Sequence, residues 1–103
     1  MIVRTNVHTF DWDDGNRAKC QKHGLSIAQI EFALTHGARV APDARHSGEE
    51  QRFIAISRTE EGRPVFVAFC WRAGRLRPIS ARYMHAREVV RYEETLGARD
   101  DDG

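Results

Sequence analysis

The sequence predicts an α+β fold in which an antiparallel sheet is packed by helices on one face, with elements in the order β-α-α-β-β-β-α. Three observations lead to this prediction. Two capped helical segments follow each other early in the chain, segments with alternating apolar residues fill the middle, and an amphipathic segment lies near the end. With 103 residues, 41% hydrophobic and 30% charged, the chain has the composition of one globular domain.

The first elements are a short strand and a helix. Phe10–Trp12 alternates aromatic and acidic side chains, as a half-buried strand does. Asp13 or Asp14 can then cap a helix that runs to His23, because an aspartate oxygen accepts hydrogen bonds from the free N–H groups of the first turn. Gly24 marks the end of this helix, since glycine readily adopts the left-handed conformation found there.

A second helix follows after a short connection. Ser26 and Gln29 have the spacing of a capping box, in which each side chain accepts from the other residue's backbone N–H. Ile30 and Leu34 lie one turn apart and predict an apolar face, and Gly37 ends the helix.

The middle of the chain alternates with the period of a strand. Arg52–Arg58, Val65–Arg72 and Leu76–Arg82 are predicted to form an antiparallel meander, to which Arg39–Ala41 can add a brief strand. Pro78 has no N–H to donate to a neighbouring strand, so the last strand is expected to lie at a sheet edge or to be bulged at this residue.

The last predicted element is a helix over His85–Leu96. Val89, Val90 and Tyr92 are its candidates for packing against the sheet. The chain then ends in an acidic segment that is expected to be a loose tail.

Composition also bounds the location of the protein. No run approaches the roughly 20 apolar residues of a transmembrane helix, and the amino terminus has no apolar export signal, so a cytoplasmic protein is expected. Cys20 and Cys70 are too few for a disulfide framework and are expected to remain thiols.

Arginine is concentrated in the second half of the chain. From Arg63 to Tyr92, seven arginines are opposed only by Glu88, which leaves this segment at about +6. The only lysines are Lys19 and Lys22. A guanidinium group favours two-pronged recognition of phosphate or carboxylate, whereas the structural alternative is a solvated arginine-rich surface.

Two neighbouring strands end in the same pattern, a small residue followed by an arginine. Val65–Arg72 turns Trp71 and other bulky side chains toward a face that helices are expected to cover, and its other face ends in Arg72. In the next strand Ser80 and Arg82 share a face. The two strands can therefore present guanidinium groups over a shallow floor, where we expect them to converge on one phosphodiester.

Several blocks of the sequence resemble the family of BrnT-type toxins. In order, the blocks are Phe10–Asp13, Asn16, Lys19, Lys22–Ser26, Glu50 with Arg52–Ile56, Ile79–Arg82, Glu88 and Tyr92. They extend from about Phe10 to Glu93, which is most of the chain. Two positions depart from the family pattern: Ser57 stands where the family often has glycine, and Pro78 interrupts the usual arginine-isoleucine-isoleucine run, which leaves the placement of Arg77 open.

The resemblance implies a RelE-like fold. One such toxin domain is expected over residues 1–97, and the acidic residues 98–103 are expected to form a disordered tail. The resemblance also implies a bacterial type II toxin, a ribonuclease that cleaves RNA and stops translation. An antitoxin encoded by the adjacent reading frame would hold it inactive, and the complex would bind promoter DNA through the antitoxin. No cofactor and no membrane partner are expected.

Metal-free RNA cleavage needs a base for the ribose 2′-hydroxyl, cationic donors for the crowded phosphorane, and an acid for the departing 5′-oxygen. Arg72 and Arg82 are the strongest candidate donors and Arg52 is a third. Glu50 and His23 are the candidate proton carriers. Arginines nearby lower the pKa of a carboxylate, whereas imidazole titrates near neutral pH, so we favour His23 as acid or base and Glu50 as base or as an orienter of Arg52.

The remaining site residues are predicted contacts to the RNA backbone, and they are Lys19, Lys22, Arg75 and Arg77. Each assignment has a structural alternative. His23 could cap the first helix through its last carbonyls, Glu50 and Arg52 could form a surface ion pair, and Arg75 and Arg77 could be an exposed turn tip.

Two other functions are weighed against cleavage. Cys20 and His23 have a spacing that could share a metal ion, but no second pair lies near them in the sequence, so no metal site is predicted. A non-catalytic module that binds nucleic acid or protein through the arginine-rich sheet face is the alternative function. Such a module would need the arginines and exposed aromatic side chains for stacking, but no proton carriers.

Overall fold

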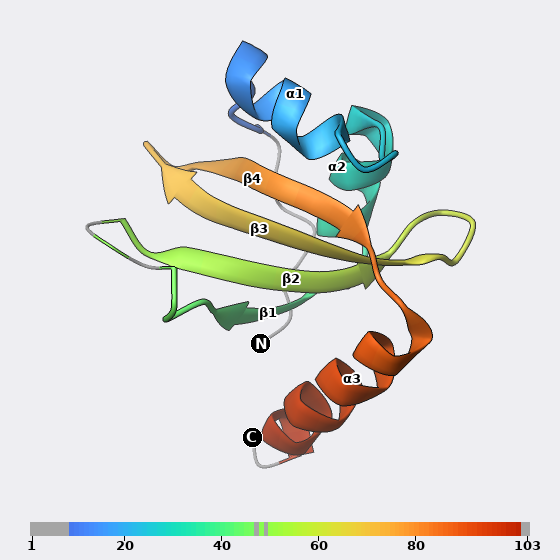
Figure 1. Cartoon of the computed structure of the whole chain (residues 1–103). Helices are drawn as coiled ribbons and strands as arrows, with labels where there is room; N and C mark the ends of the chain where they lie inside the picture. Colours follow the sequence, from blue (N-terminus) through green and yellow to red (C-terminus); the bar gives the residue numbers. More distant parts are fainter. Residues whose placement is uncertain (1–8, 47, 49, 102–103) are drawn as a thin grey trace.

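The computed structural model describes residues 9–46, 48 and 50–101, and it confirms the α+β class (Figure 1). Two helices come first, a four-stranded antiparallel sheet follows, and a third helix ends the described chain. The elements are α1 (Asp14–Gln21), α2 (Ile27–Thr35), β1 (Arg39–Pro42), β2 (Arg52–Arg58), β3 (Pro64–Arg72), β4 (Arg75–Tyr83) and α3 (Ala86–Asp101).

The first strand of the predicted order is wrong. Phe10 makes only one isolated parallel bridge to Leu76, and the N–H of Asp11 donates to the Leu76 carbonyl over 2.9 Å. The sheet instead reaches four strands through Arg39–Pro42, the segment that the sequence predicts only as a possible brief strand, and this segment is β1. The extended segment around Phe10 makes too few hydrogen bonds to the neighbouring edge strand to form a strand of its own.

Both helix starts agree with the sequence. Asp13 caps α1 in a capping box with Asn16, and Ser26 caps α2 in a capping box with Gln29. The buried Asn16 amide also donates to the carbonyls of Asp11 and Pro78, each over 2.9 Å. The bond to Pro78 attaches the start of α1 to β4, because it satisfies a carbonyl of the edge strand.

The strands lie in the order β1-β2-β3-β4, so β4 is an edge strand. Its pairing with β3 shifts register where Ala68 faces Ser80 and Phe69 faces Pro78, which leaves Ile79 as an extra residue. The prediction for Pro78 is therefore confirmed in both of its forms, an edge strand and a bulge.

The main core lies between α1, α2 and one face of the sheet. Its buried side chains include Leu25, Ile30, Leu34, Val65, Val67, Phe69, Leu76 and Ala81. Phe69 is fully buried and stacks on Phe53, with ring centroids 5.5 Å apart. Trp71 shares this face, but it is 44% exposed because it lies at the end of β3, so the expectation that helices cover it is wrong.

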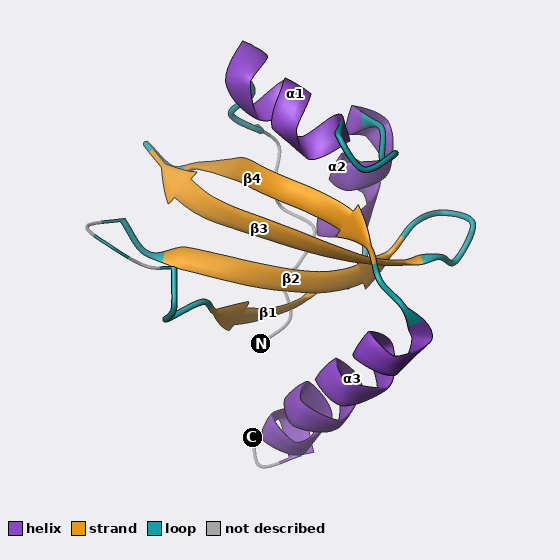
Figure 2. Cartoon of the chain, viewed as in Figure 1, coloured by secondary structure: helices purple, strands orange, loops and turns teal. Residues whose placement is uncertain are grey.

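The helices cover both faces of the sheet rather than one (Figure 2). Val89 and Tyr92 of α3 pack against Ile56 and Phe66, which alternate along their strands with the residues of the main core. Because these strands are apolar on both sides at this end of the sheet, the second face also needs a cover. Met84, just before α3, joins this smaller cluster.

The last helix is longer than the sequence predicts. α3 continues to Asp101, so the acidic segment is helical as far as that residue, and residues 102–103 lie outside the described chain. None of the helices in the described ranges is long and apolar enough to cross a membrane.

The core predicts a contrast between two apolar side chains. Replacing fully buried Phe69 with alanine should lower the free energy of unfolding by about 3–5 kcal/mol, because it leaves a cavity between Phe53 and the helices. Replacing exposed Val90 of α3 with alanine should change it by less than about 0.5 kcal/mol. Urea unfolding followed by circular dichroism measures both, and equal losses would contradict this description of the core.

Candidate active site

Three of the predicted site residues, Glu50, Arg52 and Arg72, lie on the sheet face opposite α1 and α2, at the end where β3 turns into β4. Here Arg52 is paired with Cys70, and the N–H of Asp43 donates to the Arg52 carbonyl over 2.8 Å. Figure 1 shows the connection after β1 and the β3–β4 turn at this same end of the sheet. We call the side chains of Asp43, Glu50, Arg52, Cys70 and Arg72 the polar end.

Glu50 contacts Arg72 rather than Arg52. The Arg72 guanidinium donates to the Glu50 carboxylate over 3.2 Å. The Arg72 contact and then the Cys70 contact hold the pKa of Glu50 below its usual range. Arg72 is 53% exposed and Glu50 44%, and a single exposed contact of this kind is weak. A phosphate could therefore replace Glu50 on Arg72.

Burial and the Glu50 carboxylate together raise the pKa of the Cys70 thiol. Cys70 is buried at this position, and with its pKa raised the thiol remains protonated at neutral pH.

Arg82 lies on the same face but is held by α3. Its two terminal nitrogens donate to the two oxygens of Glu88 over 2.9 and 2.8 Å. Its guanidinium lies 4.7 Å from the ring centre of Phe66. The Arg82 contact and the backbone N–H of His85 lower the pKa of Glu88 to about 2. This two-pronged pair fixes the direction of the guanidinium while leaving other N–H groups free to donate.

The three arginines share one face, but they do not converge on one point. Arg82 is paired with Phe66, whereas Arg72 lies six residues further along β3. At about 3.3 Å per residue, that separates them by roughly 20 Å along the strand direction. Arg52, which pairs with Cys70, lies roughly 13 Å from Arg82 along the same direction and is also two strands away. This spacing along the strands does not support the expectation that all three contact the same phosphodiester. Arg52 and Arg72 are close together, and Arg82 is a separate site along the same face.

His23 is on the other side of the sheet from the polar end. It is exposed just after α1, where the neighbouring Gly24 lies beside the Tyr83 ring. Because α1 packs on the main-core face, the structure does not bring His23 together with Glu50 or the arginines. The sequence could not reveal this, since His23 and Glu50 belong to elements whose relative placement depends on the whole sheet.

The predicted RNA contacts of β4 instead connect parts of the protein. Arg77 donates to Asp13 over 2.8 Å and lies 3.4 Å from Asp11, and its side chain is only 16% exposed. Arg75 donates to the Phe10 carbonyl over 2.9 Å. These bonds attach the segment before α1 to the edge strand.

The two lysines lie on α1, away from the polar end. Lys19 and Lys22 are exposed in its last turn and at its C-cap, where the Lys22 N–H donates to the Lys19 carbonyl over 3.4 Å.

One further pair of residues at the polar end, Asp43 and His46, is not among the predicted site residues. His46 Nδ1 lies 2.9 Å from an oxygen of Asp43. An aspartate at the end of a strand, followed three residues later by a histidine, is a turn signal that could have identified this pair.

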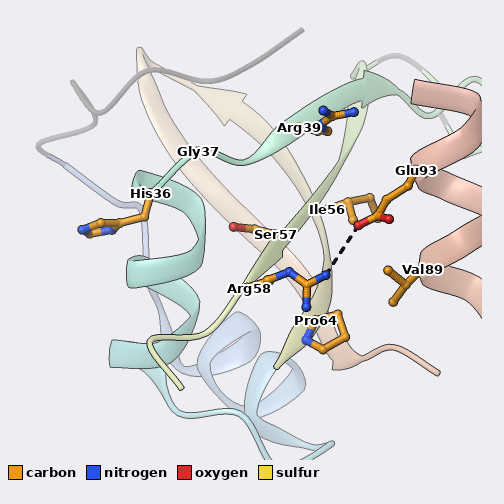
Figure 3. A pocket seen from close by; sticks show the side chains of 9 residues that line it. All are labelled: His36, Gly37, Arg39, Ile56, Ser57, Arg58, Pro64, Val89 and Glu93. Atoms are coloured by element: carbon orange, nitrogen blue, oxygen red, sulfur yellow. Dashed lines mark hydrogen bonds and ion pairs between the residues drawn. The ribbon is translucent and has the colours of Figure 1, made fainter. Parts of the chain in front are cut away.

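A cavity of about 410 Å³ lies at the opposite end of the sheet, between the strands and α3 (Figure 3). Its lining residues are His36, Gly37, Arg39, Ile56, Ser57, Arg58, Pro64, Val89 and Glu93. Arg58 reaches across it to Glu93 over 3.5 Å. The cavity therefore separates part of α3 from the sheet and is not part of the polar end.

The Cys20 and His23 pair of the metal hypothesis is not assembled. Cys20 is fully buried, which raises the pKa of its thiol to about 11, while His23 is exposed. Among the residues that the structure describes, no three His, Cys, Asp or Glu side chains lie close enough to hold a metal ion.

The fold and this face define a small α+β protein that presents arginines and a carboxylate together on one face of its sheet. A family model for the ribonuclease toxin BrnT of type II toxin-antitoxin systems matches residues 12–88. The match covers most of the chain, so the chain belongs to the BrnT toxin family. Membership implies an RNA substrate and a cognate antitoxin. Searches of curated proteins and of solved structures gave no significant match.

The contact between Glu88 and Arg82 predicts a pH-dependent contribution to stability. The pKa of Glu88 is lowered to about 2 in the folded protein, so its contribution is complete above its ordinary value of 4.5 and is lost as the pH falls from there toward 2. Glu88→Gln should therefore be less stable than the wild type at pH 7, and the difference should shrink toward pH 2.

Urea unfolding of both proteins between pH 2.5 and 7 measures this difference. Glu93→Gln is the matched control, because Glu93 lies on the same helix in an exposed contact 3.5 Å from Arg58. A Glu88→Gln loss that stays constant over the whole pH range would contradict the assignment.

Proposed function

We propose that this BrnT toxin cleaves RNA without a metal ion, through attack of a ribose 2′-hydroxyl on the adjacent phosphodiester, and that this cleavage inhibits translation. The observation that supports it is the strand register, which sets Glu50, Arg52 and Arg72 side by side at the open polar end. These side chains can supply a base and cationic donors.

Arg52 and Arg72 are the proposed donors to the scissile phosphate. Arg72 is exposed, and exchanging its weak contact with Glu50 for a phosphate costs little. Once the phosphate takes this guanidinium, the main cause of the low pKa of Glu50 is removed. Glu50 is then a better base for the 2′-hydroxyl, or it orients Arg52.

Arg82 is proposed to hold a neighbouring phosphate of the same strand. It lies roughly 20 Å from Arg72 along the sheet, a spacing that suits different phosphates of an RNA backbone running along the sheet face better than one shared phosphate. Glu88 keeps the guanidinium pointed along that face. Arg75, exposed at the β3–β4 turn beside Arg72, extends the same basic surface.

The antitoxin is proposed to be acidic where it binds. The segment from Arg63 to Tyr92 carries about six more positive than negative charges, and such a surface attracts a partner of opposite sign. Promoter DNA would be bound through the antitoxin, and no membrane is involved. Because the toxin is proposed to inhibit translation, it is expected to act in the cytoplasm.

The cleavage proposal predicts that the purified protein cuts RNA in excess EDTA and leaves 2′,3′-cyclic phosphate and 5′-hydroxyl ends. Arg52→Ala should reduce the cleavage rate by about 100- to 1,000-fold, because a donor to the phosphorane is lost. Arg63→Ala is the matched control, since Arg63 stacks 3.7 Å above the Tyr83 ring, away from the polar end. End mapping and single-turnover rates measure both.

Two outcomes would contradict the proposal. Cleavage that stops in EDTA and returns with a divalent cation would remove the metal-free route. Binding of RNA without any cleavage, with growth unaffected when the wild type is expressed, would favour the alternative, a binding module that uses the arginine-rich face.

A second prediction concerns the partner. The protein should co-elute in size-exclusion chromatography with the product of the adjacent reading frame, and this product should suppress cleavage. If an acidic surface is recognised, the complex should weaken as salt rises from about 0.1 to 1 M, because salt screens exposed charges. Separate elution at low salt would remove the antitoxin assignment and leave the ribonuclease assignment unaffected.

A further inference from the structure

We propose that His46, oriented by Asp43, is the general acid that protonates the departing 5′-oxygen during RNA cleavage. This inference rests on the function proposed above and supplies a proton donor for the leaving group at the polar end.

Asp43 is placed by the sheet. It follows β1 directly, and its N–H donates to the carbonyl of Arg52 over 2.8 Å, which continues the pairing of Pro42 with Phe53 by one residue. Successive residues of a strand alternate between faces, so Asp43 is on the same face as Ala41 and Arg52. Paired residues of neighbouring antiparallel strands have Cα atoms about 4.5–5.5 Å apart. The backbone of Asp43 is therefore next to that of Arg52, and their side chains leave the sheet on the same face.

A tight turn then returns His46 to this carboxylate. The N–H of His46 donates to the Asp43 carbonyl over 3.4 Å, and its Nδ1 lies 2.9 Å from Asp43 Oδ2. The side chain of Asp43 is only 10% exposed, whereas that of His46 is 64% exposed. The buried carboxylate therefore fixes a ring that projects into solvent at the polar end.

This geometry assigns the two ring nitrogens. A carboxylate only accepts, so Nδ1 carries a proton and donates to Asp43. Nε2 is then the nitrogen that gains and loses a proton, in the same way that a buried aspartate orients a catalytic histidine in other hydrolytic enzymes. Imidazole is suited to this role because its proton exchange is balanced near neutral pH.

The other histidines in the described part of the chain are placed differently. His36 stacks on Phe32 with ring centroids 3.9 Å apart, and its Nδ1 lies 2.8 Å from the Phe32 carbonyl. His85 precedes α3, where its backbone N–H donates to Glu88. His23 is beyond the other face of the sheet. Of these four, His46 alone combines a carboxylate partner with a position at the polar end.

The proposed step balances without any further reactant. The 2′-oxygen forms a bond to phosphorus while its proton passes to the Glu50 carboxylate. The bond from phosphorus to the 5′-oxygen breaks, its electron pair stays on that oxygen, and protonated His46 delivers its Nε2 proton there. The products are a 2′,3′-cyclic phosphate and a 5′-hydroxyl, and exchange with water restores Glu50 and His46.

A substrate with a sulfur atom in place of the scissile 5′-oxygen tests this role directly, because a thiolate leaves without being protonated. His46→Ala should cleave ordinary RNA about 100- to 10,000-fold more slowly than the wild type. On the sulfur substrate the two proteins should cleave within a few-fold of each other. Asp43→Asn should slow the cleavage of ordinary RNA by a smaller factor than His46→Ala does, because Asp43 acts through His46. On the sulfur substrate this variant should also cleave at close to the wild-type rate.

His36→Ala is the matched control, with a wild-type rate expected on both substrates. Equal rates of His46→Ala and the wild type on ordinary RNA would overturn the inference. It would also be overturned if His46→Ala slowed the cleavage of both substrates by the same factor. The same holds if His23→Ala slowed the cleavage of ordinary RNA but not that of the sulfur substrate. If the wild type cleaves neither substrate, the proposed function itself fails.

Discussion

The pairing of β3 with β4, including the extra residue Ile79, decides which side chains of the edge strand face the core. Leu76 and Ala81 are both buried in the main core although an odd number of positions separates them. A regular strand would place them on opposite faces. The extra residue in the bulge shifts the alternation of side chains by one position, so Leu76 and Ala81 lie on the same face. Leu76 therefore packs under α1 and α2 while Arg82 lies on the other face. The arginine surface exists because of this shift in register.

The second face of the sheet is divided between two uses. One end is apolar and is covered by α3 through Phe66, Val89 and Tyr92, with Arg82 held at its border by Glu88. The other end is polar and lies clear of α3 (Figure 1). The same face is apolar at one end and polar at the other because β2 has Ile56 and Ile54 toward α3 and Arg52 toward the polar end. The ribonuclease proposal depends on that open end.

The candidate site was only partly predictable. Glu50, Arg52 and Arg72 could be grouped because strand alternation and a hairpin are short-range features. Nothing in the sequence was a reason to leave His23 out of the site, since its distance from Glu50 depends on which face of the sheet α1 covers. The partner of Glu50 was also misjudged: register places Arg72 opposite it and leaves Arg52 two residues away. The turn from Asp43 to His46 was within reach of the sequence, because both residues lie in one short segment.

The sequence by itself determined the local structure of this BrnT toxin: the caps at Asp13 and Ser26, the alternating strands, and the irregularity at Pro78. These depend on residues within a few positions of each other, where backbone sterics and hydrogen bonding dominate. Only the tertiary structure decided that α3 covers the second face, that Arg77 is held by acidic residues before α1, and that Arg82 lies far from Arg72. Those outcomes depend on strand register and helix placement, which are set by packing between distant segments.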